Sequence, residues 1–318
     1  MKKKALVTGG AGFIGSHLSH RLLASDWDVH IVDNLSTGFL KNVPEEATFC
    51  EVDLSEADCI ERLPNERFDA VFHLAAQSSG EISFDDPAYD LKTNCLSTVL
   101  LCDWCLKNGT PRFLYTSSMS IYGDQEIQPV KESAIPKPKS FYGVGKLASE
   151  AYLQIYESMG LSTTSLRLFN VYGPGQNLEN MRQGMVSIYL SYILRGQELV
   201  VKGSPDRHRD LVFIGDVIDA YLACLDNPQT HGKSYNVGTG YKTTVGQLVD
   251  AELAAFGHTR ESYPVRFVEG TPGDTFGIQS DSTLMQIDTG WSPKVDLAKG
   301  LERMVAWAKD LVAQKHSF

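Results

Sequence analysis

The 318-residue sequence lacks the long apolar stretches of a membrane or secreted protein. No segment approaches the roughly 18 uninterrupted apolar residues of a membrane-spanning helix. The basic start, MKKK, is followed by ALVTGGAGFIG, which glycines interrupt, and a secretory signal would need a continuous apolar run there. We therefore expect a cytoplasmic protein that does not associate with membranes.

Positive charge is also scarce. The chain has 29 Lys and Arg against 39 Asp and Glu, which gives a formal net charge of -10. Such an acidic balance disfavours nonspecific binding to nucleic acid, although a local basic patch could still bind a small anion. We expect no nucleic-acid partner.

Cysteines are few and scattered. Of the six, only Cys102 and Cys105 lie close together in the sequence. A CxxC pair without a second pair or nearby histidines is more often two small buried side chains than a metal or redox site. We expect no metal.

What the sequence does contain is 42% hydrophobic residues and 27 glycines, enough for one large α/β unit and a smaller lobe. In the first half, short apolar runs such as KALVT and DVHIVD alternate with segments of helical period. This order indicates a parallel sheet covered on both faces, with ligands at the carboxyl ends of its strands. The predicted fold is a Rossmann doubly wound sheet in residues 1–169, with a returning segment near 209–240. A smaller C-terminal α/β substrate lobe takes up most of 170–318.

The glycine-rich segment TGGAGFIG, residues 8–15, lies between the first predicted strand and a helix. Its glycines let the backbone approach a pyrophosphate, and the helix offers its N-terminal amides to the phosphates. Asp33 closes the next strand 21 residues after Gly12, where a carboxylate would accept hydrogen bonds from the adenosine ribose. Because a carboxylate there repels a ribose phosphate, the predicted cofactor is NAD.

The predicted cofactor site extends to neighbouring strand ends. Asp53 is expected to meet the adenine edge, Ala75 and Ala76 leave room for the cofactor, and His73 is expected to be a packed structural histidine. The full cofactor set comprises Gly9, Gly12, Phe13, Ile14, Gly15, Asp33, Asn34, Ser36, Thr37, Gly38, Asp53, Leu54, Leu74, Ala75, Ala76, Gln77, Asn94, Tyr142 and Lys146.

Tyr142 and Lys146 stand four residues apart in YGVGK, so on a helix they share one face. A tyrosine with its ordinary pKa near 10 is a poor base at neutral pH, but a nearby ammonium and an oxidised nicotinamide both favour the phenolate. We predict a lowered pKa for Tyr142, with Lys146 also hydrogen-bonding the nicotinamide ribose.

Seven segments together resemble one family: TGGAGFIG, DNLSTG, HLAAQ, SSMSIYG, YGVGK, LRLFNVYGPG and RDLVFIGDV. The chain resembles the extended short-chain dehydrogenase/reductases over nearly its whole length, and within them the nucleotide-sugar epimerases of the UDP-glucose 4-epimerase type. The resemblance implies tightly held NAD, a C-terminal lobe that binds a nucleotide sugar, most simply a UDP-sugar, and a homodimer joined through helices at about 87–107 and 140–159.

The resemblance also assigns roles to residues. It makes Ser118, Tyr142 and Lys146 catalytic in 4-epimerisation: Tyr142 takes the proton of the sugar C4 hydroxyl while hydride passes to NAD, and the 4-keto sugar turns over and takes the hydride back. Arg207 and His208, beside the diphosphate ligand Arg209, are expected to be solvated. The implied substrate set is Ser79, Ser118, Ser120, Asn170, Arg182, Arg209 and Asp274.

Three departures from the family pattern leave alternatives open. Related dehydratases carry an Asp-Glu pair where this chain has Met119 and Ser120, which disfavours 4,6-dehydration. Glu81 could instead move a C3 or C5 proton, so a dehydratase or a C3/C5 epimerase is the alternative enzyme. Thr271 replaces an expected diphosphate-binding arginine. A noncatalytic NAD-sensing protein is the alternative from another class.

Overall fold

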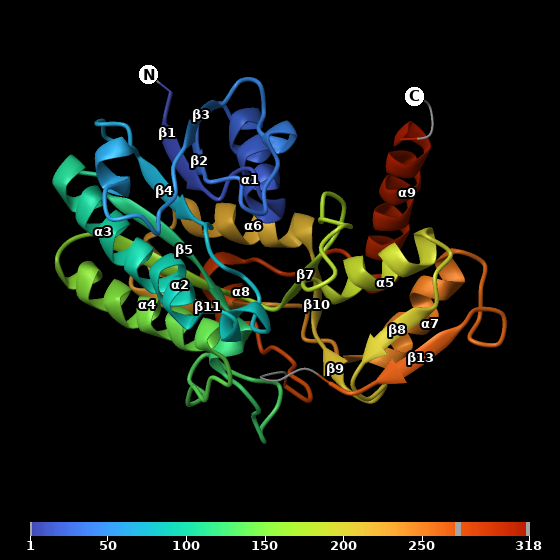
Figure 1. The fold of residues 1–318 in the computed structure, drawn as a ribbon. Coiled ribbons are helices and arrows are strands. Elements are labelled where there is room, and N and C mark those ends of the chain that lie inside the picture. The colour runs from blue at the N-terminus through green and yellow to red at the C-terminus, as the bar shows by residue number, and fades with distance from the viewer. Residues whose placement is uncertain (1, 271–274, 316–318) are drawn as a thin grey trace.

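The computed structural model describes residues 2–270 and 275–315, with side chains described as far as 313. At its centre lies a seven-stranded sheet in which every neighbouring pair is parallel. In spatial order its strands are β11 (Lys233–Val237), β6 (Ser162–Leu168), β5 (Arg112–Ser118), β4 (Ala70–His73), β1 (Lys4–Thr8), β2 (Asp28–Asp33) and β3 (Thr48–Glu51). The sequence prediction of a doubly wound parallel sheet is confirmed (Figure 1).

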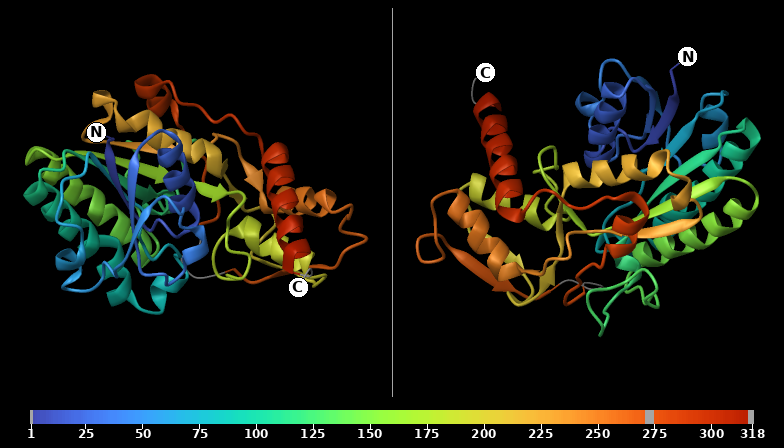
Figure 2. Two further views of the ribbon diagram at one scale, coloured as in Figure 1. Left: turned by 90° about the horizontal axis from the view of Figure 1, so that it is seen from above. Right: turned by 180° about the vertical axis from the view of Figure 1, so that it is seen from behind.

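Helices cover both faces of this sheet, because both faces are apolar. Along β1, Ala5 and Val7 enter one hydrophobic core and Leu6 enters the other, as the two-residue period of a strand requires. The first core is covered by α1 (Phe13–Ala24) and α6 (Ile214–Leu225), and the second by α3 (Ser97–Asn108) and α4 (Phe141–Ser158). Figure 2 shows these two helical layers from above and from behind.

Residues 87–108 form one continuous helical segment in three parts. It begins with α2 (Pro87–Leu91), passes through a π-helical turn (Lys92–Leu96) and continues as α3. The Asp86 side chain caps the start by accepting from Tyr89 N at 2.9 Å, and Pro87 occupies the first helical position. Gly109, with φ of 67°, ends the segment in the left-handed conformation that glycine adopts without strain.

The second lobe is built from short paired strands and helices. Its pairs are β7 (Asn170–Tyr172) with β10 (Leu211–Phe213), β8 (Leu199–Lys202) with β13 (Val265–Val268), and β9 (His208–Arg209) with β12 (Thr243–Thr244). Its helices are α5 (Met185–Leu194), α7 (Val245–Ala255) and α9 (Leu297–Lys315), and α9, upright at the right of Figure 1, packs on α7. The chain rejoins the large sheet through α6 and β11, and α8 (Thr283–Thr289) packs on β11. The domain boundary near residue 169 stays a prediction.

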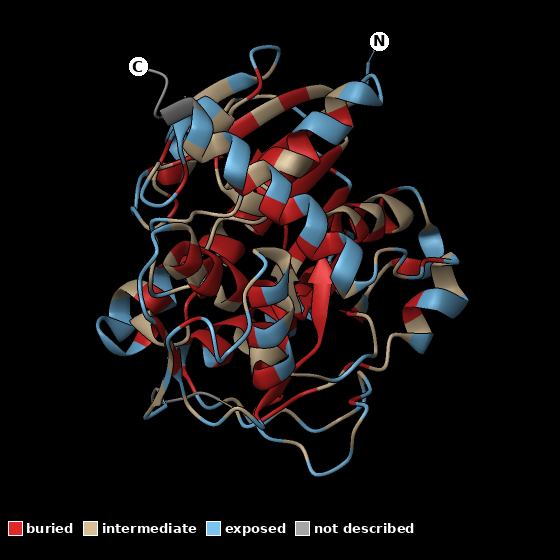
Figure 3. Ribbon diagram, turned by 90° about the vertical axis from the view of Figure 1, so that its right-hand side faces the viewer, coloured by how far each residue is buried: buried red, intermediate tan, exposed pale blue. Residues whose placement is uncertain are grey.

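Burial follows these layers. The inner strands of the large sheet and the inner faces of the helices are buried, while the edge strand β3, the outer helix faces and many loop residues are more exposed (Figure 3). Within the described residues, no helix combines the length and apolarity needed to cross a membrane.

A buried ion pair supports the carboxyl ends of the central strands. Arg167 on β6 donates two hydrogen bonds to Glu150 on α4, from Nε to Oε1 at 3.0 Å and from Nη2 to Oε2 at 2.7 Å. Both side chains are less than a tenth exposed. Glu150 also accepts from the Ser117 hydroxyl, and Arg167 donates to the Tyr122 hydroxyl at 2.7 Å. The pair therefore joins α4, β5 and β6 directly behind the strand ends.

We predict that Glu150→Ala destabilises the protein by about 3–5 kcal/mol, because it leaves the Arg167 guanidinium buried without its counter-ion. Chemical denaturation of the variant and the wild type measures the difference. Asp250→Ala is the matched control: it breaks the exposed pair with Arg260, whose Nε–Oδ1 distance is 2.6 Å, and should change stability far less. Equal losses in the two variants would contradict the assigned role of burial.

Candidate functional site

One large cleft follows the carboxyl ends of the central strands and continues between the lobes to the start of α5. Most of the predicted site residues line it. From the predicted cofactor set these are Gly9, Gly12, Phe13, Ile14, Gly15, Asp33, Asn34, Ser36, Thr37, Asp53, Leu54, Leu74, Ala75, Ala76, Tyr142 and Lys146, and from the substrate set Ser118, Ser120 and Asn170.

The glycine loop packs too closely for side chains. Gly9 has φ of +71°, and a Cβ added there would lie 2.7 Å from Ala75 N. A Cβ at Gly15 would overlap the Gly9 carbonyl oxygen and lie 2.8 Å from Gly10 Cα. Gly12 precedes α1 without a side-chain cap, so the first amides of the helix stay available for an anion. The loop has the form of a phosphate cradle.

Asp33 lies at the end of β2, beside this cradle. One carboxylate oxygen accepts from Ala11 N at 3.0 Å and the other from Leu35 N at 2.8 Å. Burial raises the pKa of the Asp33 carboxyl, while these amides act in the opposite direction. A carboxylate has further acceptor positions, so Asp33 can still bind a ribose diol. These features fit an adenosine dinucleotide.

Gly38 supports the glycine loop without lining the cleft. A Cβ added to Gly38 would lie 2.8 Å from the Ala11 carbonyl carbon. Asp53, in contrast, lines the cleft, and it accepts from Asn34 Nδ2 at 2.9 Å. Gly38 therefore packs against the glycine loop, and its contact with the cofactor stays a prediction.

Ser118, Tyr142 and Lys146 meet at the centre of the cleft. Ser118 ends β5 and its hydroxyl accepts from Ser120 N at 3.1 Å. Tyr142 and Lys146 share one face of α4, and Lys146 Nζ lies 5.8 Å from the centre of the Tyr142 ring. The ammonium donates to the Thr116 carbonyl at 2.8 Å. The predicted grouping of hydroxyl, phenol and ammonium therefore exists in the fold.

The pKa of Tyr142 differs from the prediction. Burial raises the pKa of Tyr142 to about 12, although a hydrogen bond with Ser118 acts in the opposite direction. Burial also lowers the pKa of Lys146 to about 7. The protein groups alone therefore do not lower the phenol pKa, because desolvation disfavours both charged forms more strongly, and the lowering expected from the ammonium together with an oxidised nicotinamide stays a prediction.

His73 is a structural residue, as predicted. It is 1% exposed, with Nδ1 2.8 Å from the Thr8 hydroxyl and Nε2 3.3 Å from the Ser97 hydroxyl. Burial lowers its pKa to about 3, so the ring is neutral. It packs between strand and helix and does not line the cleft.

Gln77 and Asn94, two predicted cofactor residues, lie one layer behind the cleft lining. Both donate to Asp90 Oδ2, from Gln77 Nε2 at 2.7 Å and from Asn94 Nδ2 at 3.0 Å. Gln77 also holds Ser79 through two hydrogen bonds, one to its amide and one to its carbonyl. Their direct contact with a cofactor stays a prediction.

Glu81 and Arg182 form part of an ion-pair network at the rim of the cleft. Glu81 lies 3.2 Å from Lys202 Nζ and 3.6 Å from Arg182 Nε, and Arg182 also pairs with Asp85 at 2.8 Å. Nearby, the Ser79 hydroxyl donates to the Arg182 carbonyl at 3.4 Å. None of these residues lines the cleft, so catalytic use of Glu81 and substrate contacts from Ser79 and Arg182 stay predictions.

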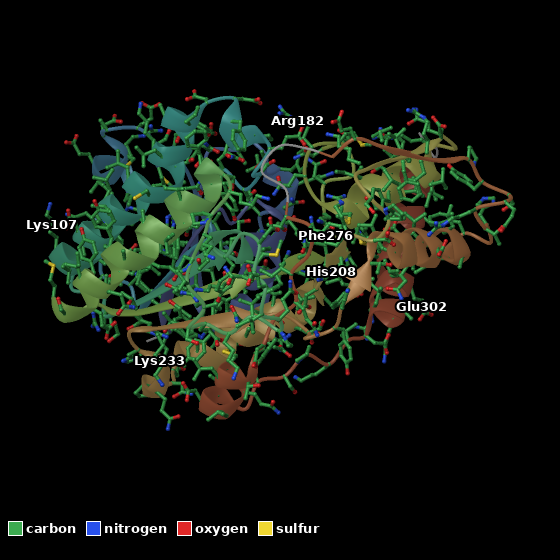
Figure 4. All side chains as sticks on the ribbon, turned by 90° about the horizontal axis from the view of Figure 1, so that it is seen from below. Lys107, Arg182, His208, Lys233, Phe276 and Glu302 are labelled. Carbon is green, nitrogen blue, oxygen red and sulfur yellow. The ribbon has the colours of Figure 1, made fainter. Side chains whose placement is uncertain are left out.

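The basic segment 207–209 is buried, so the expectation that Arg207 and His208 are solvated is wrong. Their exposed fractions are 8% and 7%. His208 lies on β9, which pairs with β12, and its ring packs against Phe276, while Arg207 donates to the Lys202 carbonyl. Arg209 is 3% exposed and donates to the carbonyls of His208 and Thr275. Figure 4 shows His208 and Phe276 close together, with Arg182 nearer the edge of the molecule.

The predicted substrate residue Asp274 and the substituted position Thr271 lie outside the described residues.

The sequence did not predict two groups of residues that shape the site. One is the polar loop before α5, which lines the cleft through Gln176, Asn177, Asn180 and Gln183. The other is the pair of glycines inside YGVGK: a Cβ at Gly143 would lie 2.6 Å from the Ser120 carbonyl oxygen, and one at Gly145 would lie 3.1 Å from Asn94 Cβ. Glycines inside a helix cost stability, and that cost was a usable signal of close packing.

Comparisons with known proteins agree with this geometry. The sequence model described as the NAD dependent epimerase/dehydratase family matches residues 5–238. A UDP-glucose 4-epimerase of Mycolicibacterium smegmatis is 34% identical over 316 residues, covering 96% of this chain and 99% of that protein.

Two solved structures are similar over the whole chain. The Thermotoga maritima UDP-glucose 4-epimerase with UDP-glucose has a TM-score of 0.91 at 35% identity, covering 97% of this chain and 99% of its own. The Thermus thermophilus UDP-glucose 4-epimerase in complex with NAD has a TM-score of 0.87 at 33% identity, covering 96% and 99%.

We predict that Gly15→Ala removes NAD binding, because the new Cβ would meet backbone atoms of Gly9 and Gly10 that cannot move aside. The NAD content of the purified variant and its NAD affinity by calorimetry measure the loss. Gly270→Ala is the control, since its Cβ would lie 3.7 Å from the nearest atom, Gly203 Cα. NAD binding by Gly15→Ala at the wild-type level would rule out the cradle.

Proposed function

Because the chain belongs to the NAD-dependent epimerase/dehydratase family, we propose that it is a nucleotide-sugar 4-epimerase that acts on a UDP-hexose. The observation that carries the proposal is the meeting of Ser118, Tyr142 and Lys146 in the same cleft as the glycine cradle. The UDP-sugars named for the similar enzymes suggest the substrate class. A cytoplasmic location belongs to the same proposal.

The proposed mechanism assigns one task to each group. The glycine cradle and Asp33 would hold NAD, and the chemistry that NAD would supply is to take a hydride from the sugar C4 and return it to the opposite face. Tyr142 removes the proton of the C4 hydroxyl and later gives it back, and Ser118 hydrogen-bonds the same oxygen. Lys146 supplies positive charge beside the phenol. Since burial raises the pKa of Tyr142 to about 12, the phenolate needs a second positive charge, and a cationic nicotinamide ring beside it would supply one.

The surroundings of Ser118 argue against dehydration. Met119 and Ser120 follow it and line the cleft, where a dehydratase of this family needs two carboxyl groups to move the C5 proton and the C6 hydroxyl. Glu81, the carboxylate that could serve a C3 or C5 epimerase, lies at the rim between Lys202 and Arg182. These positions favour C4 inversion.

A noncatalytic NAD sensor is also disfavoured by the buried ammonium. Lys146 is 2% exposed, and removing a charge from water costs several kcal/mol or more unless it is compensated. A protein that only binds NAD has no use for a proton-transfer group kept at that cost.

Incubation with a panel of UDP-, GDP-, CDP- and dTDP-sugars, followed by NMR of the products, tests the function. C4 inversion and elimination give different ring-proton couplings. We expect inversion with a UDP-hexose, and either elimination or no reaction with any sugar would refute the proposal.

In the same assay, we predict that Tyr142→Phe lowers kcat by about 10²- to 10⁴-fold and leaves NAD bound, because only the proton-transfer group is lost. Glu81→Gln is the matched control and should retain most of the C4 inversion. Full activity in Tyr142→Phe would reject its role. Complete loss in Glu81→Gln would favour the alternative C3/C5 chemistry.

We further propose a homodimer formed by the outer faces of the 87–108 segment and α4, which pack side by side (Figure 1). Exposed apolar residues recur at helical spacing on one face of α4, and others lie on the neighbouring segment and loop, where the ring centres of Phe84 and Phe141 are 5.4 Å apart. A soluble monomer rarely exposes a large apolar patch. These exposed apolar residues are Phe84, Leu91, Leu96, Phe141, Val144, Tyr152, Ile155 and Met159.

We predict that Ile155→Asp converts a particle of about twice 35.1 kDa into one of 35.1 kDa, measured by light scattering during size-exclusion chromatography. The new carboxylate would be buried without a partner in the interface. Ile287→Asp is the control, because Ile287 is 74% exposed on α8, away from these residues. A monomeric wild-type protein, or a dimeric Ile155→Asp variant, would contradict the proposed interface.

A further inference from the structure

Asp90 is a buried carboxylate directly beneath the cleft. It lies on α2 and is 1% exposed. Its Oδ2 accepts from the amide groups of Gln77 and Asn94, while Oδ1 has no hydrogen-bond partner among the described residues. Burial raises the pKa of the Asp90 carboxyl, while these two neutral donors and the charge of Lys146 act in the opposite direction.

The free oxygen of Asp90 faces the catalytic helix. A Cβ added at Gly145 would lie 3.6 Å from Asp90 Oδ1, and Gly145 immediately precedes Lys146. The close packing of Gly145 on Asn94 brings the two helices together at this point. Asp90 therefore lies within the electrostatic range of Lys146, and its charge raises the pKa of that ammonium.

Asp90 is the carboxylate near Lys146 that has no cation of its own. The other acidic group acting on Lys146 is Glu150, one turn along α4, and it is paired with Arg167 at 2.7 Å. The titratable groups that face Lys146 from the strands are His73 and Tyr115. Both are uncharged at neutral pH, because burial lowers the pKa of His73 to about 3 and raises the pKa of Tyr115.

We propose that Asp90 is a positioning residue of this site, whose carboxylate keeps Lys146 in its cationic form and thereby sets the pH range of turnover. The proposal rests on the proposed epimerase function. Asp90 also holds Gln77 and Asn94, so it ties the loop after β4 and the π-helical turn to the catalytic helix. Asp90 does not line the cleft, so its assigned role is to act through Lys146.

The sign of the pH effect follows from the charge. Removing a negative charge makes neighbouring groups lose their protons more readily, so the pKa values of Lys146 and Tyr142 both fall. Tyr142 must be deprotonated and Lys146 protonated for turnover. Both limbs of the bell-shaped pH profile of kcat therefore move to lower pH.

The test is the Asp90→Asn variant, in which the side-chain oxygen can still accept from Gln77 and Asn94. We expect both limbs of its kcat profile to move by about one pH unit, the lower end of the effect of a nearby opposite charge. Asp86→Asn is the matched control: it lies on the exposed start of the same helix, keeps its capping ability and should leave the limbs in place. A lower maximum with unmoved limbs in Asp90→Asn would reduce Asp90 to a structural role.

Two NMR measurements separate this inference from the proposed function. The ¹⁵N titration of Lys146 Nζ, assigned by its absence in Lys146→Met, should move to lower pH in Asp90→Asn whether or not any sugar is turned over. In the wild-type protein, the ¹³C signal of the Asp90 carboxyl should show an ionised group at neutral pH. A protonated Asp90, or an unmoved Lys146 titration, would overturn the inference, while inactive wild-type protein with both NMR results as expected would refute only the proposed function.

Discussion

The buried charge of Lys146 is the constraint on which the site depends. A cation taken out of water must be compensated by dipoles, rings or anions close to it. Lys146 Nζ lies 2.8 Å from the Thr116 carbonyl oxygen and 4.8 Å from the centre of the Tyr115 ring, and the charge of Asp90 acts on it from α2. These partners come from β5 and α2, so α4 must pack against both, and that packing places Tyr142 beside Ser118.

Glycines, which have no side chain, make this close packing possible. Gly143 lets α4 approach the turn after β5, and Gly145 lets it approach the π-helical turn. On the opposite wall, Gly15 lets the start of α1 pack against the glycine loop, and Gly9 lets that loop approach the backbone of Ala75. The two walls of the cleft are therefore positioned by backbone contacts between rigid elements, and such contacts hold a reacting geometry more tightly than side chains on loops could.

The sequence predicted what depends on local pattern and missed what depends on long-range contacts. Strand alternation, the glycine loop and the four-residue spacing of Tyr142 and Lys146 are local, and each lies where expected. The burial of His208 is a tertiary property, since it requires β12 and Phe276 to arrive from distant parts of the chain.

The raised pKa of Tyr142 has the same origin. It depends on how completely the surrounding elements exclude water, and no spacing of residues reports that. Gln77 and Asn94 were predicted to contact the cofactor, yet their side chains donate to Asp90.

The contacts that join the two lobes at the rim of the cleft are polar and partly exposed, whereas the proton-transfer groups inside the cleft lie on buried, tightly packed elements. The rim is joined by Gln183 and Ser78 at 2.6 Å and by the partly exposed pair of Glu81 and Lys202. Exposed ion pairs contribute little stability, so separating the lobes at the rim costs little free energy. The proton-transfer groups, in contrast, lie on tightly packed elements of the large sheet. Changes in the second lobe can therefore alter which sugar is held without disturbing the groups that act on its C4 hydroxyl.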